Sequence, residues 1–158
     1  MLIDALEPFR SEGIKNENEL LPYLQENTSK NVFDIRLQFE LTPAGDKPNI
    51  VSNTNGRYLM YSFSQMLAHH TIGGCPMNVG DLLGSGTISG TERGTEGAMI
   101  EITKGGKETI ELEGGVVRKF LQDGDTVVLR GVSGNEEDGL VGFGECRGTI
   151  LPAPKLSF

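Results

Sequence analysis

Residues 33–41 read FDIRLQFEL, and this stretch indicates the fold class more clearly than any other part of the chain. Its apolar residues stand at every second position: Phe33, Ile35, Leu37, Phe39 and Leu41. Polar residues, Asp34, Arg36, Gln38 and Glu40, fill the positions between them. Because successive side chains of a β-strand point to opposite faces, this alternation predicts one half-buried strand over the whole stretch.

The residues on either side of this strand predict a hairpin after it and irregular structure before it. Residues 42–49, TPAGDKPN, have the composition of a turn, and a short run at Ile50 and Val51 is expected to pair back against the strand. The opening stretch to about Thr28 is expected to form loops and short turns. A small apolar contact is expected there, made by Leu20, Leu21, Tyr23 and Leu24.

One long helix is expected from Arg57 to Ile72. Thr54-Asn55-Gly56 offers its N-cap, and Gly73-Gly74 offers its end. Apolar and half-polar residues recur at helical spacing along one side: Leu59, Phe63, Met66 and His70.

Short strands separated by glycine turns are expected after Gly80. Glycine supplies 22 of the 158 residues, about twice the usual ~7%. The expected strands are Leu82–Leu83, Ala98–Thr103, Glu108–Leu112, Val116–Phe120, Thr126–Gly131 and Gly142–Ile150. The sequence therefore predicts a mainly β (α+β) architecture, mostly antiparallel, with one long helix.

Composition excludes several classes of protein. The net charge is −8 and the 14 Lys and Arg residues are scattered, so no basic patch predicts nucleic-acid binding. No apolar run approaches the roughly 20 residues of a membrane span. The start of the chain lacks the pattern of a signal peptide, so we expect a cytoplasmic protein. The two cysteines, Cys75 and Cys146, form no CxxC motif and are expected to be reduced, half-buried thiols.

Familiar catalytic motifs fail on the residues themselves. GSGTISG, residues 84–90, has Ser89 where a dinucleotide-binding GxGxxG requires glycine, and the chain contains neither a P-loop nor a GxSxG motif. His69 and His70 are adjacent, which places their side chains about 100° apart on a helix. The two histidines are therefore not a metal-ligand pair, and a packed or hydrogen-bonded role is expected for at least one of them.

The block from Gly80 to Ile102 holds the remaining candidates for chemistry. A glycine-rich loop carrying Ser85, Thr87 and Ser89 precedes Glu101, which lies between two isoleucines. In a strand, Glu101 would face away from both isoleucines. Two interpretations stay open: a partly desolvated carboxylate that has a partner, or the solvated side of an amphipathic strand.

Longer blocks of the sequence resemble the fumarylacetoacetase family. YSFSQMLAHHTIGGCPMNVGDLLGSGTISG, residues 61–90, is similar to that family's signature region. GAMIEI, VRKFLQDGDTV and GFGECRGTILPA follow in the family's order and spacing. DALEPF near the start and Phe33-Asp34-Ile35 also fit, so the resemblance covers essentially the whole chain.

The resemblance implies a fold and a reaction. The family hydrolyses 4-fumarylacetoacetate, a diketo acid, to fumarate and acetoacetate in the last step of tyrosine degradation. Its catalytic domain is a β-sandwich roll, and the enzyme is a homodimer that requires a divalent metal, Mg²⁺ and/or Ca²⁺. A His–Glu dyad activates the attacking water. By this resemblance Glu101 is the dyad glutamate and Thr87 contacts the substrate.

The resemblance also implies which parts of the site are absent. The family's catalytic histidine and metal-binding carboxylates lie upstream of the matching segment, and neither His69 nor His70 takes the histidine's place. We therefore expect residues 1–158 to be the C-terminal part of a single catalytic domain whose upstream part is missing, with no metal ligands in this chain.

Three alternatives accompany this interpretation. Related hydrolases of other diketo acids carry a GTPxGVG-like loop, whereas this chain has GSGTISG followed by the insertion TERGTEGAM. The chain could instead be an inactive β-rich structural or dimerisation module. A third possibility is that a separate polypeptide supplies the histidine and the metal ligands.

Overall fold

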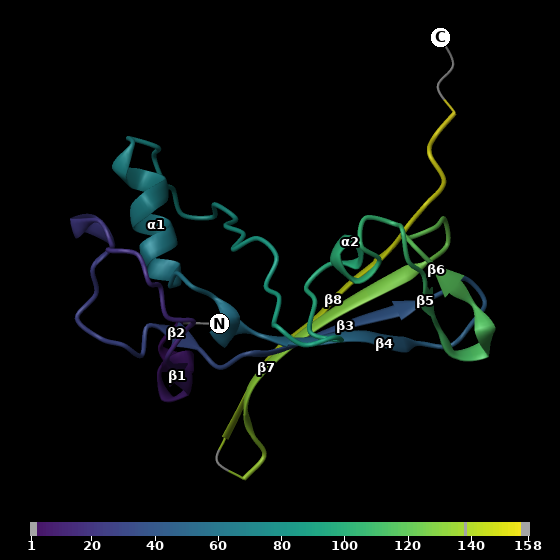
Figure 1. Cartoon of the computed structure of the whole chain (residues 1–158), viewed down its shortest axis with the longest axis horizontal. Coiled ribbons are helices and arrows are strands. Elements are labelled where there is room, and N and C mark those ends of the chain that lie inside the picture. Colours follow the sequence, from purple (N-terminus) through teal and green to yellow (C-terminus); the bar gives the residue numbers. More distant parts are fainter. Residues whose placement is uncertain (1–2, 138, 156–158) are drawn as a thin grey trace.

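The computed structural model describes residues 3–137 and 139–155, and its centre is one four-stranded antiparallel sheet (Figure 1). The strands lie in the order β4 (Asn49–Asn55), β3 (Arg36–Thr42), β7 (Thr126–Asn135) and β8 (Gly139–Thr149). Two small antiparallel pairs flank it: β1 (Arg10–Ser11) with β2 (Val32–Phe33), and β5 (Ile110–Glu111) with β6 (Val117–Arg118). The mainly β (α+β) class is confirmed.

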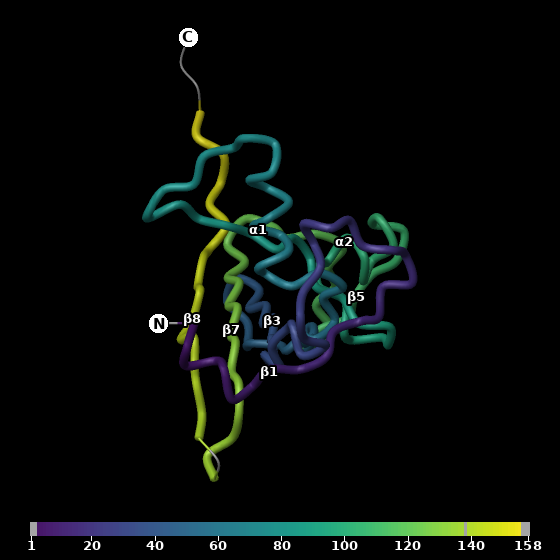
Figure 2. The backbone as a smooth tube through the Cα atoms, turned by 90° about the vertical axis from the view of Figure 1, so that its left-hand side faces the viewer, coloured from purple at the N-terminus to yellow at the C-terminus, as the bar shows by residue number. Residues whose placement is uncertain are grey.

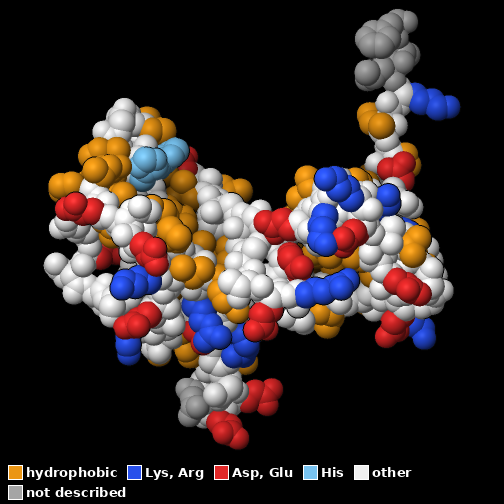
Figure 3. Space-filling model, viewed as in Figure 1, with side chains coloured by type: hydrophobic (Ala, Val, Ile, Leu, Met, Phe, Trp, Pro, Cys, Tyr) orange, Lys and Arg blue, Asp and Glu red, His pale blue; other side chains and the backbone are white. Residues whose placement is uncertain are grey.

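The helical segments are short. The α-helices are α1 (Phe63–Ile72) and α2 (Met99–Ile102). Single-turn or irregular 3₁₀ segments are η1 (Ile3–Phe9), η2 (Pro22–Leu24), η3 (Gly56–Tyr58) and η4 (Glu113–Gly115). α1, η2, β1 and β2 gather at one end of the sheet, while α2, β5 and β6 gather at the other. Figure 3 shows the same two bulky ends joined by a narrower middle.

The predicted strand 33–41 is divided between two sheets. Asp34 donates its amide to the Phe9 carbonyl, and the Ile35 amide turns back to the Phe33 carbonyl, so the chain bends before β3 begins at Arg36. Phe33 consequently packs with Leu6 and Ile35 in a small core. Burial does not alternate along β3: Leu41 is fully buried, whereas the residues from Leu37 to Glu40 are all half-buried.

The predicted hairpin is confirmed, because β4 pairs antiparallel with β3. β7 pairs with the other edge of β3, from Arg36 opposite Val132 to Thr42 opposite Thr126. β7 and β8 are longer than the expected strands and form a hairpin of their own. Figure 2 shows β8 on the outer side of β7, with the C-terminal segment leading away from the sheet.

The long helix begins later than predicted. Asn55 caps the 3₁₀ segment η3, and the extended backbone at Leu59 (φ −68°, ψ 133°) ends that segment. The N-cap of α1 is Ser62, whose hydroxyl accepts from the Gln65 amide while the Gln65 side chain accepts from the Ser62 amide. This reciprocal capping box satisfies two amides that the first turn leaves without partners.

Two predicted strands are wrong. Ala98–Thr103 contains the helix α2 instead, since Ile102 and Thr103 donate their amides back to Ala98 and Met99. Lys104 and the two glycines after it take positive φ angles, which turns the chain immediately afterwards. In so short a run, the two-residue period of a strand cannot be distinguished from the 3.6-residue period of a helix. Leu82–Leu83 forms no strand and is exposed.

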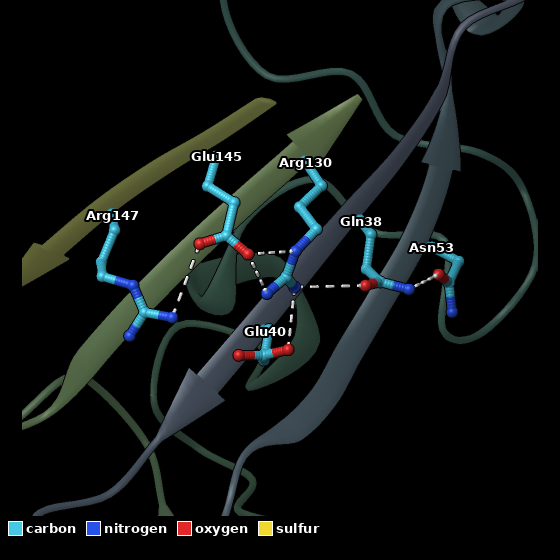
Figure 4. A network of polar contacts seen from close by, with 6 residues as sticks. All are labelled: Gln38, Glu40, Asn53, Arg130, Glu145 and Arg147. Atoms are coloured by element: carbon cyan, nitrogen blue, oxygen red, sulfur yellow. Dashed lines mark hydrogen bonds and ion pairs between the residues drawn. The ribbon is translucent and has the colours of Figure 1, made fainter. Parts of the chain in front are cut away.

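A polar network ties three strands together on one face of the sheet (Figure 4). Arg130 on β7 donates to Glu40 on β3 at 2.8 Å and to Glu145 on β8 at 2.7 and 2.9 Å. Hydrogen bonding to Arg130 lowers the pKa of Glu145. Residues one position along the strands, among them Phe39 and Leu129, point to the opposite face, which is therefore apolar where β3 and β7 form it.

A buried ion pair fixes the end of the sheet near β6. The Asp125 carboxylate is fully buried and accepts two hydrogen bonds from the Arg118 guanidinium, at 2.9 and 3.0 Å. It also accepts from the Gln122 amide at 2.9 Å. The bonds from Arg118 are the main reason why the pKa of Asp125 is lowered.

We expect Asp125→Asn to lower the free energy of unfolding by about 3 kcal/mol at neutral pH, because it leaves Arg118 without its counter-ion. A carboxyl whose pKa is lowered by folding stabilises the protein fully above the unfolded value of about 3.9, and this contribution is lost as the pH falls through the folded value. Urea unfolding followed from neutral to acidic pH measures both effects. Asp123→Asn, an exposed carboxylate two residues away, is the control, and an equal loss there would contradict the assignment.

Candidate functional site

The loop between Gly84 and Ala98 is anchored to the sheet by side chains of β4. The Thr54 hydroxyl donates to the Ile88 carbonyl at 3.0 Å. The Ser52 hydroxyl, whose residue is 3% exposed, reaches the carbonyls of Gly94 at 3.1 Å and Glu96 at 2.6 Å. β4 therefore holds the loop on both sides of its turn, at Ile88 and, six to eight residues later, at Gly94 and Glu96.

The insertion TERGTEGAM closes on itself above β4. The Gly90 amide donates to the Thr95 carbonyl at 2.9 Å, and the Gly94 amide donates to a Glu96 carboxylate oxygen at 2.7 Å. These bonds bring Gly90, which precedes the insertion, beside Thr95 in its middle, and fold the Gly94–Glu96 segment on itself. Its C-terminal end leads directly into α2.

Glu101 lies on α2 with an exposed side chain. Its Oε2 accepts a hydrogen bond from the Ser89 hydroxyl at 2.6 Å. The same hydroxyl oxygen accepts from the Gly97 amide at 3.0 Å. Glu101 therefore has a hydrogen-bond partner, as the first interpretation predicts, but its side chain is exposed rather than partly desolvated.

Thr87 lies in the same loop, also exposed, at the rim of a hollow of about 220 Å³. The floor of the hollow is formed by residues of the apolar sheet face, including Leu37, Phe39 and Leu129. Gly97 packs against Thr87 so closely that a Cβ there would lie 2.6 Å from the Thr87 Cγ2 atom. Gly97 and Ser89 thus bring the segment of Thr87 and that of Glu101 together.

A second, apolar groove of about 480 Å³ continues from this hollow beside α2. It shares three residues with the first hollow: Phe39, Gly97 and Leu129. The remaining lining includes Met99, Phe120, Leu121 and Val127. The site can therefore present the Thr87 hydroxyl beside an apolar surface that accommodates the carbon chain of a small ligand, while Glu101 follows the groove residues Ala98 and Met99 in the chain and lines neither hollow.

The two histidines lie outside this site, on α1. His69 Nδ1 is 3.0 Å from the Tyr23 hydroxyl, and His70 Nε2 is 3.1 Å from the Cys75 sulfur. The hydrogen-bonded role expected for at least one histidine is confirmed. Both cysteines are free but exposed, so their predicted partial burial is wrong.

The described residues do not fit a metal ion. Within residues 3–137 and 139–155, no group of three or more His, Cys, Asp or Glu side chains could hold one. Glu101 has a serine rather than a second carboxylate beside it. In the same part of the chain, none of the helices combines the length and the hydropathy needed to cross a membrane.

The hydroxyls of the loop are predicted from the sequence as candidates, but the hydrogen bonds that hold the loop are not. Ser52 and Thr54 of β4 carry a signal for these anchoring bonds, because two hydroxyl residues two positions apart in a strand point to the same face. The bond from Ser89 to Glu101 had none, since it depends on the helical turn that was predicted as a strand.

Comparison with known proteins gives a consistent result. The sequence profile of the fumarylacetoacetate (FAA) hydrolase C-terminal family matches residues 8–151. The chain is 58% identical over 160 residues to the fumarylacetoacetase of Aspergillus fumigatus, covering 100% of this chain and 37% of that protein. It is 43% identical over 157 residues to the fumarylacetoacetase of Dictyostelium discoideum, covering 97% and 36%.

The human fumarylacetoacetase is 40% identical over 153 residues, covering 96% of this chain and 36% of that protein. The chain thus spans a little over a third of the length of the curated relatives that it matches. The match extends over almost all of the residues that form the sheet, the anchored loop and α2. The chain belongs to the fumarylacetoacetate hydrolase C-terminal family.

Proposed function

We propose that this chain is the C-terminal part of a fumarylacetoacetase, an enzyme that hydrolyses 4-fumarylacetoacetate to fumarate and acetoacetate. The observation that carries the proposal is the contact between Ser89 and Glu101, which places a carboxylate beside the loop of Thr87 in a chain of this family. The adjoining apolar hollows supply room for a small diketo acid.

The proposed role of Glu101 is to orient a histidine base that comes from outside the described residues. The histidine removes a proton from water, and the water oxygen attacks the carbonyl carbon on the fumaryl side. A carboxylate bonded to the other ring nitrogen fixes the tautomer and stabilises the imidazolium that forms. The carbon–carbon bond then breaks, its electron pair goes to the acetoacetate carbon, and that carbon takes up a proton.

Thr87 is proposed to bind the substrate. Its hydroxyl can donate a hydrogen bond to a carbonyl or carboxylate oxygen of the diketo acid, which offers several acceptors. A hydroxyl on an anchored loop binds at a small cost in conformational entropy, because its backbone is already fixed.

The finer features of the family belong to the same proposal. These are a β-sandwich roll of which this chain is one part, a homodimer, a cytoplasmic location and a place in tyrosine degradation. Mg²⁺ or Ca²⁺ would polarise substrate oxygens when bound, and its ligands would come from outside the described residues. GSGTISG with its long insertion supports fumarylacetoacetase over the hydrolases of other diketo acids.

A second candidate function, a β-rich interaction module, is favoured by the large exposed surface. The chain exposes 11107 Å², whereas a compact protein of 17.1 kDa exposes roughly 7,800 Å². The difference of about 3,300 Å² on this chain alone exceeds the roughly 1,000–2,500 Å² that each partner commonly buries in an obligate interface. Part of it is the outer edge of β8, which pairs with no strand among the described residues.

These two candidates differ in what the 158-residue chain does by itself. If it contributes only part of a site, we expect no detectable hydrolysis of 4-fumarylacetoacetate by the purified chain, with or without Mg²⁺ or Ca²⁺. A chimera that carries this chain in place of the matching segment of the Aspergillus fumigatus relative should hydrolyse it. The measurement is the loss of substrate absorbance. A correctly folded but inactive chimera would favour the interaction module.

Glu101→Gln in that chimera tests the dyad. The amide keeps the shape of the side chain but cannot stabilise an imidazolium, so we expect kcat to fall about 10²- to 10⁴-fold. Glu136→Gln, on the remote turn between β7 and β8, makes the same change of charge and should leave kcat within about twofold. Wild-type turnover by Glu101→Gln would refute the assignment.

Thr87→Val removes one hydroxyl with little change of shape. We expect KM to rise about tenfold with kcat changed less than threefold, because a typical hydrogen bond contributes about 1 kcal/mol. Thr91→Val, at an exposed position in the same loop, is the matched control. Steady-state kinetics of both variants decide between substrate binding and a general effect on the loop, which would alter both variants alike.

A further inference from the structure

We propose that Ser89 is a positioning residue, which fixes the Glu101 carboxylate in the orientation that the reaction requires. This inference rests on the proposed function of Glu101. The Ser89 hydroxyl donates to Glu101 Oε2 at 2.6 Å while it accepts from the Gly97 amide at 3.0 Å. The three residues therefore form one short chain of hydrogen bonds from the backbone to the carboxylate.

The direction of this chain follows from the donors and acceptors available. A serine hydroxyl has one hydrogen and two acceptor lone pairs. The Gly97 amide can only donate, so it occupies a lone pair of Ser89 and leaves the hydroxyl hydrogen for Glu101. An ionised carboxylate is the stronger acceptor in such a pair, and the short distance of 2.6 Å agrees with a charge-assisted bond.

The backbone is hydrogen-bonded on both sides of Ser89, to the sheet on one side and within the loop on the other. The carbonyl of the preceding residue, Ile88, accepts from Thr54 on β4, and the amide of the following residue, Gly90, donates to Thr95. The hydroxyl thus projects from a backbone whose neighbours are fixed in place. A donor on a fixed backbone can set the rotamer of a more mobile side chain.

Glu101 needs such a partner because its own surroundings are open. It lies on a helix of four residues and its side chain is exposed. Across residues 3–137 and 139–155, Ser89 supplies the one hydrogen bond that reaches this carboxylate. With Oε2 bound to Ser89, Oε1 is left to accept a hydrogen bond from the N–H of an incoming imidazole.

The test uses the chimera with the Aspergillus fumigatus relative and a matched pair of variants, Ser89→Thr and Ser89→Val. The two side chains have nearly the same shape, and only threonine keeps the hydroxyl. We expect kcat to fall about 10- to 100-fold in Ser89→Val, with KM within about twofold, and to stay within about threefold of wild type in Ser89→Thr. Ser85→Ala, in the same loop, should leave both constants unchanged.

A double variant separates positioning from a general structural effect. If Ser89 acts through Glu101, Ser89→Val should cause little further loss in the Glu101→Gln background. An equal loss in both backgrounds, or equal activities of Ser89→Thr and Ser89→Val, would overturn the inference. Full activity of Glu101→Gln would instead refute the proposed function itself. Thermal unfolding of each variant verifies that the fold is retained.

Discussion

β3 is hydrogen-bonded along both of its edges, to β4 on one side and to β7 on the other, and the candidate site depends on this double pairing. A strand paired on both sides has its register fixed twice, so its apolar and polar faces cannot exchange without breaking both ladders. The apolar face of β3 becomes the floor of the hollow beside Thr87. Its neighbour β4 contributes the hydroxyls that anchor the loop above that floor.

The two faces of the sheet serve different purposes as a result. On one face, Arg130 on β7 donates to Glu40 on β3 and to Glu145 on β8, which links the three strands through their side chains (Figure 4). On the other, apolar side chains remain partly open to solvent and form the two hollows. A charge network on one side thus allows the opposite side to stay available for a ligand or for further protein.

The sequence predicted what depends on periodicity and missed what depends on contacts across the chain. The β3–β4 hairpin and the two strands of the final hairpin follow from alternation and turn residues, and the structure contains them. The bend between Phe33 and Arg36 does not, because it arises from a bond to Phe9, far away in sequence. The strand predicted around Glu101 is a helix for a related reason: Thr103 and the glycines after it turn the backbone, and six residues are too few to show either period. Family resemblance supplied the proposed roles of Glu101 and Thr87, whereas only the structure connects their segments through Ser89 and Gly97.

The exposure of Glu101 to solvent is unexpected for a carboxylate in the proposed role. A carboxylate that acts on a histidine works best when water is excluded, since charges interact more strongly in a medium of low polarity. Here the carboxylate is open, while Met99 of the same helix lines an apolar groove and the outer edge of β8 has no partner among the described residues. Protein that covered the groove would exclude water from Glu101 in the same event that brought a histidine to it. The partial desolvation that the sequence left open as one interpretation would then be a property of the assembled site. Ser89 would hold the carboxylate in place before that assembly occurred.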